Sequence, residues 1–79
     1  MPKAFVAVNT VERSDDKEMK ERLSKVDGVK EVYSVYGIYD FCLVVEADTE
    51  EELLDIASKR IKPVKGVLSI LTLVVAATE

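Results

Sequence analysis

The sequence of 79 residues contains no histidine, no tryptophan and a single cysteine, Cys42. Histidine is the side chain that most often transfers protons at neutral pH, so its absence excludes the usual Ser-His-Asp and Cys-His nucleophile systems. One cysteine cannot form an intramolecular disulfide, and no cluster of cysteine and histidine is present to bind zinc. We therefore expect no metal, no cofactor and no enzymatic activity.

Phosphate-binding loops and long apolar runs are also missing. The three glycines, at positions 28, 37 and 66, fit neither GxxxxGK[ST] nor GxGxxG. No apolar run approaches the roughly 20 residues that span a bilayer, and no signal-peptide pattern is present. A net charge of −4 opposes binding to nucleic-acid phosphates. These absences predict a soluble, cytoplasmic protein that contacts neither nucleic acid nor membrane directly.

The composition, with 48% hydrophobic and 33% charged residues, is that of a globular protein. The length allows one domain, which we expect to span residues 1–79. Lysine and glutamate dominate the charge, a bias reported in hyperthermophile proteins and a hint of a thermophilic source. A core of this size contributes only marginal stability, and disulfides and metals are absent. Association with further copies is therefore the expected additional source of stability.

Apolar patterning predicts the element order β-α-β-β-α-β. Strands rich in β-branched and aromatic residues are expected at 4–8, 29–36, 41–47 and 67–76. The first helix is expected to begin at Ser14 or Asp15, and its apolar stripe consists of Met19, Leu23 and Val26.

The second helix is expected to begin at a cap formed by Asp48 or Thr49, with Glu51 or Glu52 completing a capping box. It should end near Pro63. Its core-facing residues are expected to be Leu53, Ile56, Ala57 and Ile61, with Leu54 beside them.

This order predicts an α+β fold, a ferredoxin-like sandwich in which a four-stranded antiparallel sheet carries two helices on one face. The strands lack the alternation of a solvated second face. In the first strand Ala4, Val6 and Val8 oppose Phe5 and Ala7. The other apolar strands are expected to place Phe41, Leu43 and Val45 opposite Cys42 and Val44, and Val67, Leu71, Leu73 and Val75 opposite Leu68, Ile70 and Val74. Because monomers rarely expose so large an apolar patch, we expect a two-fold dimer that packs sheet against sheet.

The segment 35–41 is unusual because two tyrosines, Tyr36 and Tyr39, lie at a turn. An ordinary hairpin explains Gly37, which tolerates positive φ, and Asp40, which bonds local amides. Tyrosine combines an apolar body with a polar tip, which suits an interface or the rim of a ligand site. From the residues alone, a plain turn and a contact site remain equally open.

The spacing Gly37-x-Tyr39-Asp40 before an apolar strand resembles the effector domain of the Lrp/AsnC regulators, the RAM domain. Two further groups extend the resemblance over essentially the whole chain, namely Gly28-Val29-x-x-Val32 and Gly66-Val67 followed by Thr72. The helix-turn-helix of that family is missing from this sequence, so the chain resembles a stand-alone RAM protein.

The resemblance implies a homodimer that assembles into higher rings, octamer or decamer, with an amino-acid effector bound between dimers. The implied ligand-binding residues are Gly37, Tyr39 and Asp40 of the turn and Ile70 and Thr72 of the last strand. Asp40 would meet the ammonium, the Thr72 hydroxyl and the amides around Gly37 would meet the carboxylate, and Tyr39 would wall the side chain. The family often has a second threonine where this sequence has Ile70.

The resemblance also implies a function: an amino-acid-binding regulatory and oligomerisation module that modulates transcription through co-assembly with full-length Lrp/AsnC regulators. An ACT-type regulatory domain has a similar fold and role but fits the Gly37-x-Tyr39-Asp40 pattern less well. Two other classes remain as alternatives. One is a small enzyme of the dimeric α/β-barrel kind, with Tyr33, Tyr36 and Asp40 in a cavity between sheet and helices, and the other is a purely structural ring-forming protein.

Overall fold

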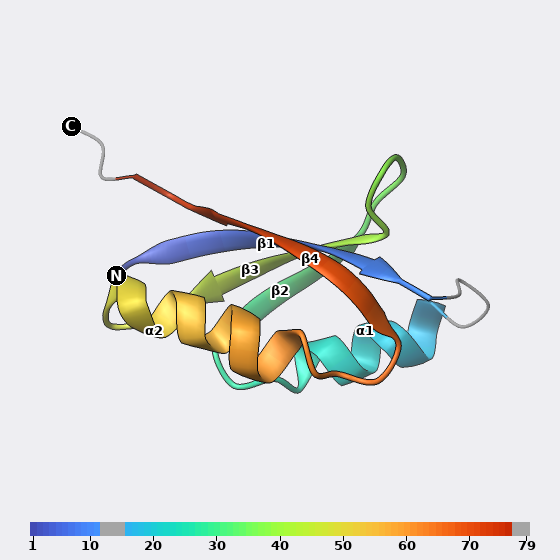
Figure 1. Ribbon diagram of the computed structural model, residues 1–79, viewed down its shortest axis with the longest axis horizontal. Helices are drawn as coiled ribbons and strands as arrows, with labels where there is room; N and C mark the ends of the chain where they lie inside the picture. The colour runs from blue at the N-terminus through green and yellow to red at the C-terminus, as the bar shows by residue number, and fades with distance from the viewer. Residues whose placement is uncertain (12–15, 77–79) are drawn as a thin grey trace.

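The computed structural model describes residues 1–11 and 16–76, which follow the order β-α-β-β-α-β (Figure 1). The strands are β1 (Lys3–Thr10), β2 (Val29–Ser34), β3 (Phe41–Glu46) and β4 (Val67–Val74). The helical segments are α1 (Asp16–Ser24), α2 (Glu50–Asp55) and η1 (Ile56–Ile61), and η1 directly continues α2. The strands form one antiparallel sheet in the order β2-β3-β1-β4, which confirms the predicted ferredoxin-like fold.

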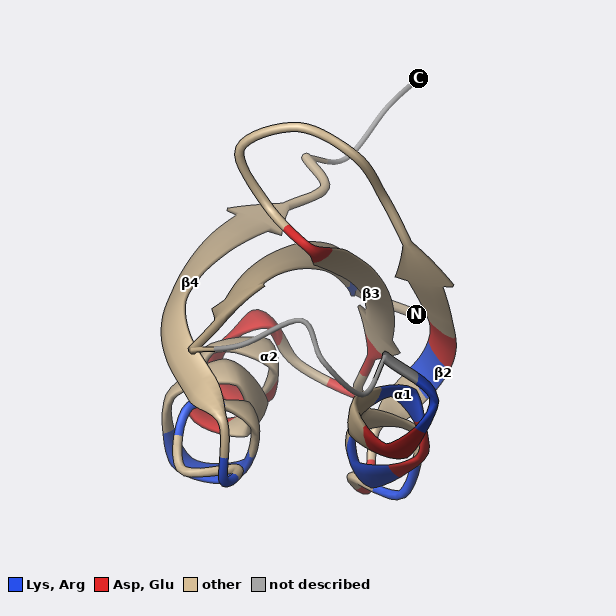
Figure 2. Ribbon diagram, turned by 90° about the vertical axis from the view of Figure 1, so that its right-hand side faces the viewer, with Lys and Arg blue, Asp and Glu red and all other residues tan. Residues whose placement is uncertain are grey.

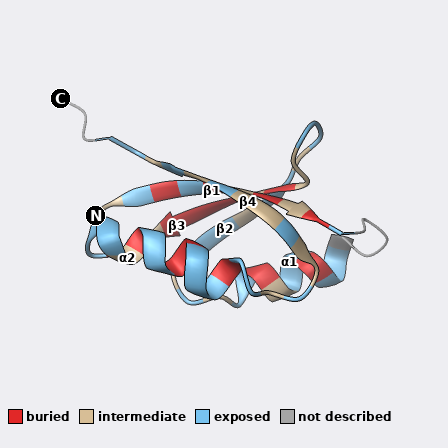
Figure 3. Ribbon diagram, in the orientation of Figure 1, coloured by how far each residue is buried: buried red, intermediate tan, exposed pale blue. Residues whose placement is uncertain are grey.

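The helix α1 and the continuous helix α2–η1 lie on the same side of the sheet, which curves over them (Figure 2). Buried residues occur in both helices and in the strands (Figure 3), and they form one core cluster. The largest fully buried side chains are Val6, Val8, Leu23, Phe41, Leu43, Val45, Leu53, Ile56 and Ile61. Each burial of this kind is worth roughly 1.5–3 kcal/mol relative to exposure, so this layer holds the helices against the sheet.

The start of α2 is fixed by the predicted capping residues. The Thr49 hydroxyl accepts a hydrogen bond from the Glu52 amide at 3.1 Å, and the Glu52 carboxylate accepts one from the Asp48 amide at 3.3 Å. Thr49 is therefore the cap, and Glu52 bonds the residue before it. The predicted caps of the first helix, Ser14 and Asp15, lie outside the described residues.

The predicted faces of β4 are wrong at its first two residues. Asn9 pairs with Ser69, but Thr10 pairs with Val67, so Leu68 is an extra residue in the ladder. This bulge shifts the alternation by one residue, and therefore Val67 packs on the core while Leu68 is 61% exposed. Strict alternation predicts Val67 on the face of Leu71 and Leu73, and Leu68 on the opposite face.

The second helix also departs from the prediction. Its last turns are π-helical, with the Lys62 amide donating to the Ala57 carbonyl at 2.9 Å. Leu54, expected beside the core, is 51% exposed, because the core-facing position of that turn is occupied by its neighbour Leu53. None of the described helices is long and apolar enough to cross a membrane.

All four predicted strand ends shift as well. The strands predicted at 29–36, 41–47 and 67–76 end earlier, at Ser34, Glu46 and Val74. The first strand is longer than predicted and continues to Thr10. This polar residue occupies the next core-facing position after Val6 and Val8.

Candidate functional site

The sheet face opposite the helices carries no described helix (Figure 1). Cross-strand pairing places two rows of residues on this open face, Glu31-Val44-Phe5-Leu73 and Tyr33-Cys42-Ala7-Leu71. Phe5 is 39% exposed, Leu71 43% and Leu73 54%. Most charged residues lie on the helices instead (Figure 2). The open face is therefore largely apolar over β3, β1 and β4, while β2 contributes Glu31 and Tyr33.

Two residues of the open face, Cys42 and Tyr33, have titratable side chains. Cys42 is half-buried and lies between Ala7 and Tyr33. The hydrogen bond between Tyr33 and the Glu31 carboxylate, together with the negative charge of that carboxylate, raises the pKa of Tyr33 above its ordinary value of 10.0.

The β2–β3 loop, residues 35–40, contains the predicted site residues Gly37, Tyr39 and Asp40. The loop rises from the sheet on the side away from the helices (Figures 1 and 2). At its tip Tyr36 is 97% exposed and Ile38 is 85% exposed. Gly37 has a φ of +129°, a conformation that other residues rarely adopt, and an added Cβ would meet nothing within 4 Å. The tip is thus presented to solvent rather than packed on the domain.

Asp40 is the anchored end of this loop. Its Oδ2 accepts hydrogen bonds from the amide of Thr10 at 2.8 Å and from the hydroxyl of Thr10 at 2.9 Å. The Asp40 amide donates to the Val8 carbonyl at 2.9 Å, and its carbonyl accepts from the Val35 amide at 3.0 Å. Thr10, a partner of this carboxylate, is therefore 30 residues away, a contact that the hairpin interpretation did not predict.

Thr10 was missing from the sequence-based site. It is only 9% exposed and continues the core-facing alternation of Val6 and Val8. A polar side chain in that phase of a strand needs a hydrogen-bond partner, and this was the signal that could have identified it.

Ile70 and Thr72 lie on β4, two strands away from β3. Ile70 pairs with Val8 and Thr72 with Val6, and both of these valines are buried under the helices. Cross-strand partners share a face, so Ile70 and Thr72 belong to the helix side of the sheet. The loop rises on the other side. Within one protomer, the structure does not bring the loop residues and the β4 residues into one pocket.

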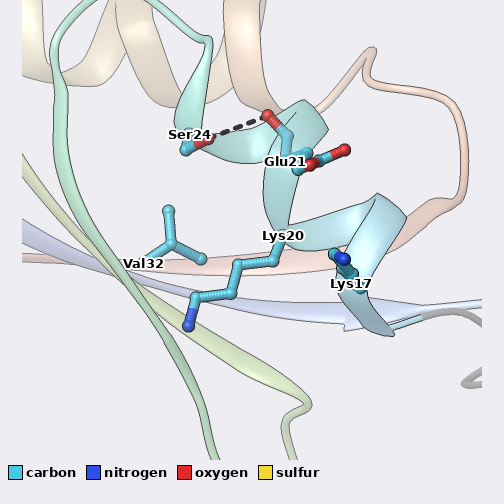
Figure 4. A pocket seen from close by; sticks show the side chains of 5 residues that line it. All are labelled: Lys17, Lys20, Glu21, Ser24 and Val32. Atoms are coloured by element: carbon cyan, nitrogen blue, oxygen red, sulfur yellow. Dashed lines mark hydrogen bonds between the residues drawn. The ribbon is translucent and has the colours of Figure 1, made fainter.

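A separate depression of about 330 Å³ lies between α1 and β2 (Figure 4). Lys17, Lys20, Glu21, Ser24 and Val32 line it, and the side chain of Lys20 extends across it. The Ser24 hydroxyl donates to the Glu21 carbonyl at 2.9 Å. None of the predicted ligand-binding residues contributes to this depression.

The enzyme alternative needs Tyr33, Tyr36 and Asp40 in a cavity between sheet and helices. Tyr33 instead lies on the open face, 50% exposed, and Tyr36 lies at the exposed loop tip. Within residues 1–11 and 16–76, no group of three or more histidine, cysteine, aspartate or glutamate side chains is placed to hold a metal ion. The structure therefore does not bring Tyr33 and Tyr36 into the cavity that this alternative requires.

The chain is similar to known proteins in both sequence and fold. The Lrp/AsnC ligand binding domain matches residues 3–78. The uncharacterized HTH-type transcriptional regulator PF0250 of Pyrococcus furiosus is 38% identical over 58 residues, which cover 73% of this chain and 39% of that regulator.

Solved structures extend the similarity to the fold. The crystal structure of TTHA0845 from Thermus thermophilus has a TM-score of 0.87 and 30% identity, covering 100% of this chain and 98% of that one. The feast or famine regulatory protein Rv3291c of M. tuberculosis, complexed with L-methionine, has a TM-score of 0.79 and 26% identity. The match covers 99% of this chain and 52% of the M. tuberculosis chain.

Proposed function

The chain belongs to the Lrp/AsnC ligand-binding domain family, and from this premise we propose that it is an amino-acid-binding regulatory and oligomerisation module. It acts by co-assembly with full-length Lrp/AsnC regulators and does not itself contact DNA. The net charge of −4 supports the last point, because affinity for DNA depends on neutralising phosphates with lysine and arginine. A relative with the same fold has been crystallised with L-methionine, which supports an amino acid as the ligand.

The observation that carries the proposal is the open apolar face. Phe5, Leu71 and Leu73 lose much of their exposure if a second copy packs against this face. A two-fold axis would bring identical rows together, so each apolar contact would occur twice. A module that uses an apolar sheet face as its dimer interface is suited to assembly with copies of the same fold.

The ligand site in this proposal lies between dimers. Because the loop and the inner face of β4 lie on opposite sides of one sheet, a pocket containing both needs residues from more than one protomer. In that pocket the amides around Gly37 bind the ligand carboxylate, helped by the Thr72 hydroxyl, and Tyr39 borders the ligand side chain. The Asp40 carboxylate accepts two hydrogen bonds from Thr10. Its negative charge makes it the group of the loop that suits the ligand ammonium.

A thermal-shift screen of the twenty amino acids, combined with mass measurement with and without the best hit, tests this function. We expect one or a few amino acids to raise the melting temperature and change the oligomer mass, because a ligand that binds only the folded assembly stabilises it. Thr72→Val should weaken the response. Ser69→Ala is the matched control, since it removes a hydroxyl from the other face of the same strand.

If no amino acid stabilises a protein that still forms a ring, the amino-acid-binding part of the proposal is wrong. The structural ring-forming protein is then the better interpretation.

A further inference from the structure

The β2–β3 loop needs something to hold its direction. Its tip is exposed at Tyr36 and Ile38, so the tip itself contributes little packing against the domain. At the base, the Val35 amide donates to the Asp40 carbonyl at 3.0 Å, which closes the loop on itself. That bond joins the two ends of the loop but does not orient the loop relative to β1. Contacts between the base and β1 give it such an orientation, and one of them is the bond from the Asp40 amide to the Val8 carbonyl at 2.9 Å.

Thr10 makes such a contact. Its amide and its hydroxyl both donate to one oxygen of Asp40, at 2.8 and 2.9 Å. The β1–β3 ladder ends at the pair Val8 and Phe41, so the Asp40 carboxylate binds a β1 amide that lies beyond the ladder. Because Thr10 is only 9% exposed, water competes weakly for these charge-assisted bonds.

We propose that Thr10 is the positioning residue of the β2–β3 loop: its amide and hydroxyl hold Asp40 and thereby set the direction in which the loop tip is presented. For the amino-acid site, this inference rests on the proposed function above. The role differs from that of a ligand-binding residue, since Thr10 acts through Asp40.

The end of β1 also connects the loop to β4. Thr10 pairs with Val67 across the bulge, and the amide of the next residue, Val11, donates to the Gly66 carbonyl at 2.9 Å. The same strand end therefore fixes both the loop base and the start of β4. The β2–β3 loop and β4 contain the candidate ligand-binding residues. A change at Thr10 therefore affects both of these parts of the chain.

Two substitutions separate the hydroxyl from the shape of the side chain. Thr10→Val keeps the β-branch and the backbone amide but removes the hydroxyl donor. Thr10→Ser keeps the hydroxyl and removes a methyl group. Ile61→Val is the matched control, because Ile61 is fully buried in η1 and its truncation lowers global stability without touching the loop.

Hydrogen exchange of the segment 33–42, followed by mass spectrometry, measures the proposed role directly. The amides of Val35 and Asp40 report the loop base, since both are hydrogen-bonded there. We expect Thr10→Val to speed their exchange about fivefold, the effect of losing one hydrogen bond. Thr10→Ser should behave like the parent chain, and Ile61→Val should leave these amides unchanged relative to the rest of the sheet. Equal exchange in Thr10→Val and Ile61→Val would overturn the inference.

A second measurement connects the loop to ligand binding. Calorimetry with the amino acid found in the screen should show affinity about fivefold weaker in Thr10→Val and restored in Thr10→Ser. If the parent chain binds no amino acid, the proposed function fails, while the exchange result still decides whether Thr10 positions the loop. If the parent chain and Thr10→Val bind equally well, the proposed function stands and the role of Thr10 in the site is wrong.

Discussion

Leu73→Glu should prevent the chain from pairing through its open face. Leu73 lies at the end of one apolar row, where it pairs with Phe5, and it is 54% exposed. In a sheet-to-sheet dimer this exposed half would be covered by the partner. A glutamate carboxylate at this position would lose its hydration when the dimer forms and would gain no positively charged partner.

The magnitude follows from the exposed fraction. Burying a whole leucine is worth roughly 1.5–3 kcal/mol, so covering about half of one contributes about 1 kcal/mol per protomer. A two-fold interface contains the residue twice, so truncating it removes about 2 kcal/mol, or roughly thirtyfold in the dissociation constant. Each buried, unpaired glutamate adds several kcal/mol of desolvation. We therefore expect the dissociation constant to rise on the order of a thousandfold or more.

Sedimentation at micromolar concentration, with circular dichroism to verify folding, is the assay. Leu54→Glu is the matched control, because Leu54 is 51% exposed but lies on α2, on the helix side of the sheet. The control should sediment like the parent chain, while Leu73→Glu should be a folded monomer. A Leu73→Glu variant that remains as large as the parent, or a parent chain that is itself monomeric, would refute the sheet-to-sheet interface.

Three smaller perturbations test local features. Gly28→Ala should lower stability by about 2 kcal/mol in denaturant unfolding, because Gly28 has a φ of +102° and a Cβ would lie 2.6 Å from Ile56 Cδ1; a loss below about 0.5 kcal/mol would show that the turn adjusts freely. Thr49→Ala should cost about 1 kcal/mol in the same assay, since it removes the cap of α2, and Thr49→Ser should recover most of it. Glu31→Gln should lower the pKa of Tyr33 toward 10.0, measured by ultraviolet titration of tyrosine. Because the pKa of Tyr33 is raised in the folded state, the interaction with Glu31 stabilises the fold fully below about pH 10, and this stabilisation is lost as the pH rises above that value. If the titration of Tyr33 is the same in Glu31→Gln and in the parent chain, Glu31 is not the cause of the raised pKa.

The fold was predictable because each element has a local pattern that agrees with its packing. The alternation of Ala4, Val6 and Val8 against Phe5 and Ala7 predicts both faces of β1, and the structure confirms both. Patterns of this kind depend only on neighbours along the chain. The irregularities of the fold do not: the Leu68 bulge exists only relative to the partner strand, and no residue type in β4 marks it.

The candidate site was only partly predictable for the same reason. Gly37, Tyr39 and Asp40 are close in sequence, and they do share one loop. The bond between Asp40 and Thr10 joins residues 30 positions apart, so a local hairpin was a sufficient explanation for Asp40 until the sheet register was known. The π-helical turns of η1 were equally hidden, because the hydrogen-bond spacing of a helix is not determined by composition.

The position of the two groups of site residues has a thermodynamic consequence. If the loop and the inner face of β4 meet only across protomers, an amino acid that needs both binds the assembly and not the free chain. Binding and assembly are then linked, and by reciprocity the ligand favours assembly by the same factor by which assembly favours the ligand. Under the proposed function, a chain of 79 residues can in this way convert a change in amino-acid concentration into a change in how much of its partner is bound. The size of that change depends on how rigidly the loop is held, since a loop that must first be ordered loses part of the binding free energy to entropy.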